Sequence, residues 1–315
     1  MKILEEYTDE DHSLTMADII KRLEEYGITA ERKSVYHDID RLREFGFDIE
    51  GEQRRKTFYY RLISRDFEEL ELKLLVDCVQ SAKFITESKS NELIKKLESL
   101  VSVYGARKLQ RQVFVKGRVK SINEKVYYNA DCIHEAINTN HMISFQYLTW
   151  NVNKTQTLKH NGKKYIVSPL GLIWDNENYY LVAFEGAEDK IKHFRVDRMT
   201  STVVIEAKRD AKDAIRSFDG VEYEKRLFNM MDGETTMVEL ECKNWMADIL
   251  IDRFGTDCMM HPVDDERFKF NVNVNVSDQF FAWVIGLGEG IRIVGPERVV
   301  NRMKEITERL VKQYT

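Results

Sequence analysis

Apolar residues in the first part of the chain recur three or four positions apart, the spacing of a helix with one buried face. Residues 15–27 follow this spacing, with Thr15 where a helix cap is favoured and Gly27 where a helix ends. Residues 31–45 follow it again and stop before Gly46. The pattern therefore predicts two helices joined by a short turn. The apolar positions of the second predicted helix are Val35, Ile39, Leu42 and Phe45.

A hairpin pattern follows at residues 47–63, where aromatic segments flank a polar and basic centre. This arrangement predicts two β-strands whose connecting tip carries cations. Residues 66–104 return to helical spacing and carry two apolar stripes. Each stripe can pack within the chain or against a second copy of it. The stripes are Leu70, Leu74 and Leu75, and then Leu93, Leu97, Leu100, Val101 and Tyr104.

A basic stretch runs from Gly105 to Lys125, with seven cations against Glu124. It is either a solvated linker or a route between two functional parts of the chain. From residue 126 the pattern changes to a helix at 131–138 and then several short strands with turn-rich breaks. Short strands at close spacing predict a small antiparallel barrel. The predicted strands are 142–147, 164–167, 170–174, 179–184, 191–196 and 202–205.

The last part of the chain alternates strand and helix patterns. The strand-helix pair occurs three times in succession, which predicts a compact α+β domain. The predicted strands are 236–242, 267–276 and 292–294, and the predicted helices are 245–253, 278–287 and 297–314.

Composition narrows the class of protein. The chain has 315 residues, 43% of them hydrophobic and 32% charged, which suits about two or three folded domains. Its net charge of −5 means that any nucleic-acid binding must rest on local charge. Apolar runs long enough to cross a membrane are absent, and the acidic N-terminus does not suit a signal peptide. The scattered cysteines suit reduced thiols, so we expect a cytoplasmic protein with no membrane partner. They are Cys78, Cys132, Cys242 and Cys258.

Two helices, a tight turn and a basic hairpin form the plan of a winged helix-turn-helix. In that plan the second helix offers polar and cationic side chains to the major groove, and the hairpin reaches flanking phosphates. An alternative is a helical module with a solvated charged face, which Asp38, Asp40 and Glu44 favour. The candidate duplex-binding residues are Arg32, Lys33, Ser34, Tyr36, His37, Arg41, Arg54, Arg55 and Lys56.

Residues 31–49 resemble the recognition helix of bacterial winged regulators of the DeoR-like type. That helix carries Thr or Ser, an apolar residue, two polar residues, Asp, and Ile or Leu, and residues 34–39 match this series. His37 stands where the family commonly has Arg.

Residues in the predicted barrel resemble the WYL domain, which is named for a Trp-Tyr-Leu triplet that is Tyr179-Tyr180-Leu181 in this chain. Residues 143–147 resemble its first strand, 168–172 its Pro-Leu-Gly segment and 194–198 its Phe-Arg-Leu-Asp-Arg segment. The tail, through residues 280–288 and Gly295-Pro296, resembles the C-terminal extension that often follows such domains.

These resemblances imply a transcription regulator with a multidomain α+β fold. The expected parts are a winged helix-turn-helix at 1–64, a helical linker or dimerisation segment at 65–120, a WYL domain with a small SH3/Sm-like antiparallel β-barrel at 121–207, a connector at 208–232, and a compact C-terminal α/β extension at 233–315. We expect double-stranded promoter DNA as one partner and a homodimer as the working form, because one module reads only a few base pairs. The dimer could form through the linker helices or the C-terminal extension.

The resemblance also implies that the WYL barrel senses an effector, which for some family members is thought to be single-stranded nucleic acid. Aromatic faces and cations suit such an anionic ligand, or a nucleotide. The alternatives are barrel packing for the tyrosines, and ion pairing of Arg195 and Arg198 with Asp197 or Asp175. The candidate effector-binding residues are Tyr147, Ser168, Tyr180, His193, Arg195 and Arg198.

The sequence gives little support for an enzyme. The seven histidines lack metal-ligand spacing, and the glycine-rich residues 286–290 lack the order of a nucleotide-binding loop. We therefore expect no catalysis, no metal and no cofactor. A non-catalytic interaction scaffold with a nucleic-acid-sensing barrel and weak duplex contacts is the alternative to a regulator.

Overall fold

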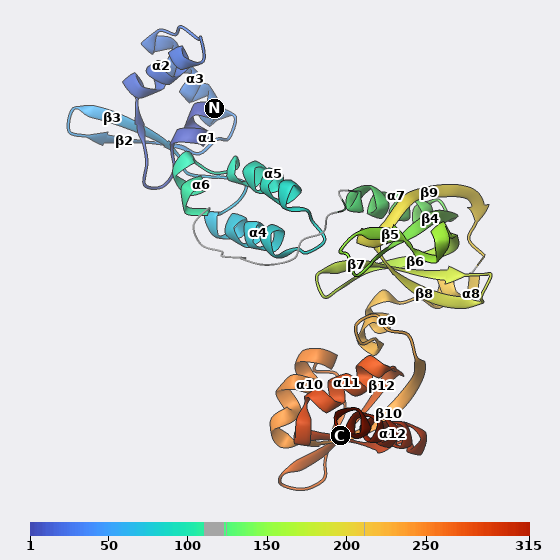
Figure 1. Cartoon of the computed structure of the whole chain (residues 1–315). Coiled ribbons are helices and arrows are strands. Elements are labelled where there is room, and N and C mark those ends of the chain that lie inside the picture. Colours follow the sequence, from blue (N-terminus) through green and yellow to red (C-terminus); the bar gives the residue numbers. More distant parts are fainter. Residues whose placement is uncertain (110–122, 124, 211) are drawn as a thin grey trace. The chain divides into compact units, whose positions relative to one another are not determined.

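The computed structural model describes residues 1–109, 123, 125–210 and 212–315, and it divides into two compact units. The first unit is Met1–Glu124 and the second is Lys125–Thr315. Each is described by itself below (Figure 1). In the part of the chain that is described, no helix is both long and apolar enough to span a membrane.

The first unit opens with a small helical core against a three-stranded sheet. The sheet order is β1-β3-β2, and Val35, Ile39 and Tyr60 are among the residues buried at its centre. Both predicted helices and the predicted hairpin are confirmed, and Thr15 forms a capping box with Asp18. The elements are α1 (Lys2–Tyr7), β1 (Leu14–Thr15), α2 (Met16–Glu25), α3 (Arg32–Glu44), β2 (Ile49–Arg54) and β3 (Thr57–Leu62).

The described residues of the first unit form three further helices, α4 (Glu69–Ser81), α5 (Glu87–Glu98) and α6 (Val103–Leu109). Arg65, which precedes α4, links them to the N-terminal part, because it donates to the carbonyls of Glu5 and Thr8 at 2.6 Å and to that of Leu100 at 3.3 Å. Asp9 adds a second link, since it accepts from the Ser102 hydroxyl at 2.6 Å. The predicted boundary at residue 64 therefore falls inside one packed unit.

The two apolar stripes of the predicted linker differ in the structure. Leu70 is 70% exposed and Leu74 is 66% exposed, so the first stripe does not pack within the described chain. In the second stripe, Val101 is buried and Leu97 packs against its cluster. Most of the predicted basic stretch lies at 110–122 and 124, outside the described residues.

The second unit begins with α7 (Val126–Asn138), which packs on an antiparallel sheet. The sheet order is β5-β4-β6-β7-β8, and β9 pairs with β4. Among the described residues no pairing joins β8 to β9, so the predicted closed barrel is not confirmed. The strands are β4 (His141–Trp150), β5 (Gln156–Leu158), β6 (Lys164–Asp175), β7 (Asn178–Glu185), β8 (Lys190–Arg195) and β9 (Met199–Lys208).

One prediction in this sheet was wrong in detail. Residues 164–167 and 170–174 form one strand, β6, and not two. Pro169 is accommodated because the pairing of β6 with β7 shifts by one residue between Pro169 and Gly171. An irregularity of this kind lets a strand continue past a residue that lacks an N–H donor.

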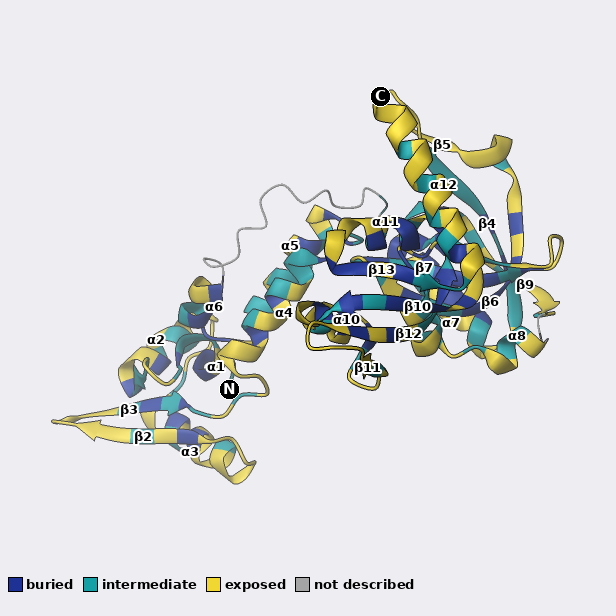
Figure 2. Cartoon of the chain, turned by 90° about the horizontal axis from the view of Figure 1, so that it is seen from below, coloured by how far each residue is buried: buried dark blue, intermediate teal, exposed yellow. Residues whose placement is uncertain are grey.

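Two short helices follow the sheet and lead to the C-terminal part, α8 (Lys212–Ser217) and α9 (Gly220–Arg226). The strand and helix order predicted for that part is confirmed, with β11 as an addition. Its sheet order is β11-β12-β10-β13, with a buried core that Figure 2 shows in dark blue. The elements are β10 (Glu234–Lys243), α10 (Ala247–Phe254), β11 (Met260–Pro262), β12 (Arg267–Val276), α11 (Asp278–Gly286), β13 (Ile291–Gly295) and α12 (Glu297–Tyr314).

Candidate functional site

Helix α3 presents one apolar face to the core and one polar face to solvent. Val35 and Ile39 are each 4% exposed and lie four residues apart. Lys33 and His37 precede them by two positions, which is about 200° around a helix, so they point away from the core. The exposed side of α3 therefore carries a row of basic or titratable side chains spaced four apart. The row is Lys33, His37 and Arg41.

Two of the other predicted residues on α3 contact each other. The guanidinium of Arg32 donates to the hydroxyl of Tyr36 at 3.2 and 3.3 Å. The ring of Tyr36 in turn meets Tyr60 of the hairpin, with ring centres 6.5 Å apart. Tyr36 is half-buried and joins α3 to the hairpin, whereas Ser34 is exposed at the start of the helix.

The tip of the hairpin has two cations without an ion pair to another described residue. These are Arg55, which takes a left-handed backbone conformation at φ 58°, and Lys56. Arg54 is different, since it pairs with Glu52 at 2.7 Å. Figure 2 shows this end of β2 and β3 as exposed. The tip therefore offers two uncommitted positive charges. The pair of Arg54 with Glu52 was not predicted from the sequence, although a spacing of two residues puts both side chains on one face of β2.

Strands β7 and β8 bring several predicted effector residues onto one face. Tyr180 is directly opposite Arg195, and Val182 is opposite His193. Arg195 makes an ion pair with Asp197 at 2.8 Å, so the pairing alternative considered for this arginine is confirmed. Its guanidinium also donates to the side-chain oxygen of Asn178 at 2.7 Å. Burial acts to lower the pKa of Arg195, but the hydrogen bonds and charge of Asp197 raise it above the usual value.

His193 is covered by helix α9. Its Nε2 lies 3.0 Å from the hydroxyl of Tyr223. Burial lowers the pKa of His193, and burial together with the charge of Asp232 raises the pKa of Tyr223 to about 12. His193 is therefore favoured as a neutral ring inside a contact between the sheet and α9. Sequence reasoning missed Tyr223, which lies thirty residues away along the chain.

Tyr147 and Ser168 lie apart from the Tyr180 face. The ring of Tyr147 packs at 5.6 Å from Phe194, which points to the opposite side of β8 from Arg195. Burial raises the pKa of Tyr147, and its hydroxyl accepts from the backbone N–H of Arg195 at 3.0 Å. Ser168 is fully buried and donates to Asp210 at 2.5 Å. The structure argues against Ser168 as an effector contact, because its hydroxyl is sealed in an internal bond.

Arg198 is the predicted effector residue with the most freedom. It is half-exposed at the end of a short 3-10 helix, Val196–Arg198, and makes no ion pair or hydrogen bond with another described residue. Its charge acts to lower the pKa of both Tyr147 and Tyr180, although burial raises both overall. The short helix is held by buried Asn129 of α7, whose amide donates to the carbonyls of Val196 at 3.1 Å and Met199 at 2.9 Å.

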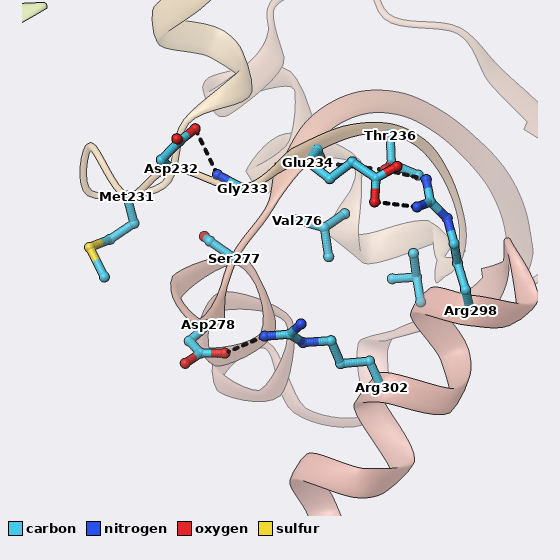
Figure 3. Close-up of a pocket in the computed structure, with 11 residues that line it drawn as sticks. Met231, Asp232, Gly233, Glu234, Thr236, Val276, Ser277, Asp278, Arg298 and Arg302 are labelled. Carbon is cyan, nitrogen blue, oxygen red and sulfur yellow. Dashed lines mark hydrogen bonds and ion pairs between the residues drawn. The ribbon is translucent and has the colours of Figure 1, made fainter. Parts of the chain in front are cut away.

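A cavity in the C-terminal part was not anticipated from the sequence (Figure 3). It has a volume of about 500 Å³ and lies between the start of β10, the start of α11 and helix α12. Two arginines of α12 line it. Arg298 pairs with Glu234 and donates to the Thr236 hydroxyl oxygen at 2.8 Å, while Arg302 pairs with Asp278 at 3.3 Å. Each guanidinium is thus balanced by a carboxylate.

Metal ligands do not gather in the described part of the chain. Within those residues, no group of three or more histidine, cysteine, aspartate or glutamate side chains is placed to hold an ion. The four cysteines are free thiols, and burial raises the pKa of Cys242 to about 12.

Comparison with known proteins bears on the second unit. The WYL domain model matches residues 129–204, and the WCX domain model matches residues 237–311. No curated protein matches the chain. Among solved structures, Proteasome accessory factor B/C (PafBC) of Arthrobacter aurescens is 17% identical, with a TM-score of 0.30, over 94% of this chain.

The present chain spans 46% of that PafBC chain. A CRISPR Cas-related protein is 12% identical, with a TM-score of 0.37, over 78% of this chain and 80% of the other. The WYL match covers the residues that resemble the WYL domain, and the WCX match covers the residues that resemble its C-terminal extension. The chain thus carries a WYL domain followed by a WCX domain.

Proposed function

We propose that this protein is a DNA-binding transcription regulator whose WYL domain responds to an anionic effector. The observation that carries the proposal is the row of Lys33, His37 and Arg41 on the solvent face of α3, in the same packed unit as the uncommitted cations of the hairpin tip. In this proposal residues 1–64 act as a winged helix-turn-helix. The protein works in the cytoplasm, without catalysis and without a cofactor.

The geometry of α3 suits the major groove. The N-terminal turns of a recognition helix contact base edges, and here those turns carry Lys33 and His37 with no acidic residue in the first turn. The hairpin tip at Arg55 and Lys56 suits phosphate contacts, which add affinity without reading sequence.

The WYL domain offers an aromatic and cationic surface for the effector. Arg198 is available for a phosphate, and Tyr180 lies beside Arg195 on the same face of the sheet. A phosphate that reached Arg195 would compete with Asp197 for a bidentate guanidinium. A single-stranded nucleic acid or a nucleotide carries the anionic charge that these arginines suit. Tyr180 is the candidate stacking partner, and it is half-buried against the cluster that includes Leu227 and Met230.

The proposed working form is a homodimer. Two modules are normally needed to read an operator, with half-sites about a helical turn apart. The exposed leucines of α4, Leu70 and Leu74, suit a partner surface because burying them would remove apolar area from water. Light scattering at working concentration checks this point, and a monomer would contradict it.

Duplex binding is tested by fluorescence anisotropy with DNA from the upstream region of the gene. Replacing Lys33 and His37 together by alanine should weaken binding by about 1–3 kcal/mol for each specific contact, or roughly 5- to 150-fold. Lys304→Ala on the exposed side of α12 is the matched control for loss of charge. Unchanged affinity of the double variant would remove α3 from the interface.

Effector binding is tested with a labelled single-stranded oligonucleotide. Arg198→Ala and Arg195→Ala should each weaken binding, whereas Ser168→Ala should leave the affinity of folded protein unchanged because that hydroxyl is internal. Equal binding by wild type and both arginine variants would refute the assignment.

One observation favours the alternative function, a non-catalytic interaction scaffold. Arg54 and Arg61 of the hairpin are paired with Glu52 and Glu50, which reduces the net charge that the hairpin offers to a phosphate. Under this alternative the full chain would bind the oligonucleotide but not the duplex, so the same two assays separate the two functions.

A further inference from the structure

The hairpin tip has little buried surface to hold its direction. Its base is anchored in the core by Ile49 and Leu62, which are 4% and 3% exposed. The strands then run outward through four more residue pairs to Arg54 and Thr57, and most side chains of β2 beyond Ile49 are exposed. Tyr60, which is 4% exposed and meets Tyr36, holds the lower hairpin against α3, so the direction of the residues beyond it depends on contacts outside this core.

Arg43, in the last turn of α3, makes the contacts that could fix this direction. Its Nε donates to the carbonyl of Ile49 at 2.9 Å, where β2 begins. Another nitrogen of the same guanidinium pairs with Asp40 of α3 at 3.3 Å. The planar group thus bridges the helix and the first residue of the strand.

Gly51 shows how closely the guanidinium lies against β2. A Cβ on Gly51 would lie 3.1 Å from Nη2 of Arg43 and 2.4 Å from the ring of Phe58. The φ angle of Gly51 is not in the left-handed region, so the glycine is needed for space and not for backbone conformation. Phe58 itself is two positions along β3 from Tyr60, the residue opposite Gly51. Arg43, Gly51 and Phe58 therefore form one close-packed joint.

We propose that Arg43 is a positioning residue, which holds the basic tip at Arg55 and Lys56 in register with α3 so that both can engage one duplex. This rests on the proposed duplex binding. Lysine cannot replace arginine here, because an ammonium group is a single point of charge whereas a guanidinium presents a flat fork of donors. The tip would then lose its fixed direction although its own cations remain.

The salt dependence of binding tests the proposal on the full chain, with a labelled random-sequence duplex of about two helical turns, roughly 21 base pairs. Each phosphate contact contributes about 0.9 to the slope of log affinity against log salt concentration. Replacing Arg55 and Lys56 by alanine should lower the slope by about 1.8. Arg43→Lys should lower it by a similar amount while keeping the net charge, and adding Arg43→Lys to the tip variant should change little further.

A control and a second variant keep the result interpretable. Arg22→Lys is the control, since Arg22 of α2 has a similar side-chain exposure, 35% against 38%, and a similar helical ion pair. Gly51→Ala perturbs the same joint from the strand side and should also lower the slope. Urea midpoints within the range of the control show that the variants are folded.

Three results would overturn the proposal. Arg43→Lys could keep the slope of the wild type while Arg43→Ala loses about 0.9, which would make Arg43 a direct phosphate contact. In the second result, the decreases in slope caused by Arg43→Lys and by the tip variant add in full. In the third, both Arg43→Lys and Gly51→Ala bind with the same slope as the control. Absence of duplex binding by the wild type would instead refute the proposed function, and this outcome is distinct from the other three.

Discussion

Asn129 holds the turn that presents Arg198, and its replacement by alanine gives the sharpest stability prediction. Asn129 is 3% exposed, and its amide donates to the carbonyls of Val196 and Met199. Val196 and Met199 are themselves fully buried, so water cannot easily replace the lost donor. The variant removes these two hydrogen bonds from the interior, while the carbonyl of Val196 still accepts from the backbone N–H of Met199.

The magnitude follows from those two bonds. A buried hydrogen bond contributes about 0.5–1.5 kcal/mol net, so two suggest a loss of about 1–3 kcal/mol. Local opening of the turn should become more frequent by roughly 5- to 140-fold, since about 1.4 kcal/mol is a factor of ten. Oligonucleotide affinity should fall with it, because Arg198 loses its fixed position.

Hydrogen exchange measured by mass spectrometry checks this, with amides of residues 196–204 as the readout. Asn301→Ala is the matched control, since Asn301 lies on the exposed side of α12. Protection at the turn should fall in Asn129→Ala and stay at the wild-type level in the control. A variant that keeps its protection to within about 0.5 kcal/mol would show that the amide does not hold the turn.

Two further predictions concern the rest of the second unit. Burial lowers the pKa of His193 below its usual 6.5. As the pH falls, the unfolded chain therefore binds a proton at this residue at a higher pH than the folded chain does. Stability is lost as the pH falls below 6.5 through the folded-state pKa. His193→Gln should remove that part of the pH dependence, measured as urea midpoints at about pH 5 and about pH 7.5, and identical curves would refute the role of burial. Gly233→Ala should destabilise the C-terminal part by about 1–3 kcal/mol, because its Cβ would lie 2.4 Å from the carbonyl oxygen of Val276. Gly220→Ala, with only an ordinary contact at 3.7 Å, should be neutral or stabilising, and equal melting temperatures of the two variants would contradict the packing argument.

Local order in this protein could be predicted from the sequence because it depends on local periodicity. Thr15 was placed as a helix cap, the hairpin tip was placed at residues 54–56, and Tyr180 and Arg195 were placed on strands that the structure confirms. A helix or strand with one buried face repeats its apolar residues at a fixed interval, so the interval alone is informative. Glycine and capping residues then mark the ends.

The availability of the candidate residues was decided only by the tertiary structure. Ser168 is occupied by Asp210, and His193 by Tyr223, each partner thirty or more residues away. The tertiary structure also decided that β8 and β9 do not pair with each other in the described part of the chain, because pairing between strands depends on how distant segments pack. Local spacing specifies which residues face the same side, but a long-range contact forms only where the folded chain brings two segments together, and that contact settles whether a charged or hydroxyl group is free to bind a ligand.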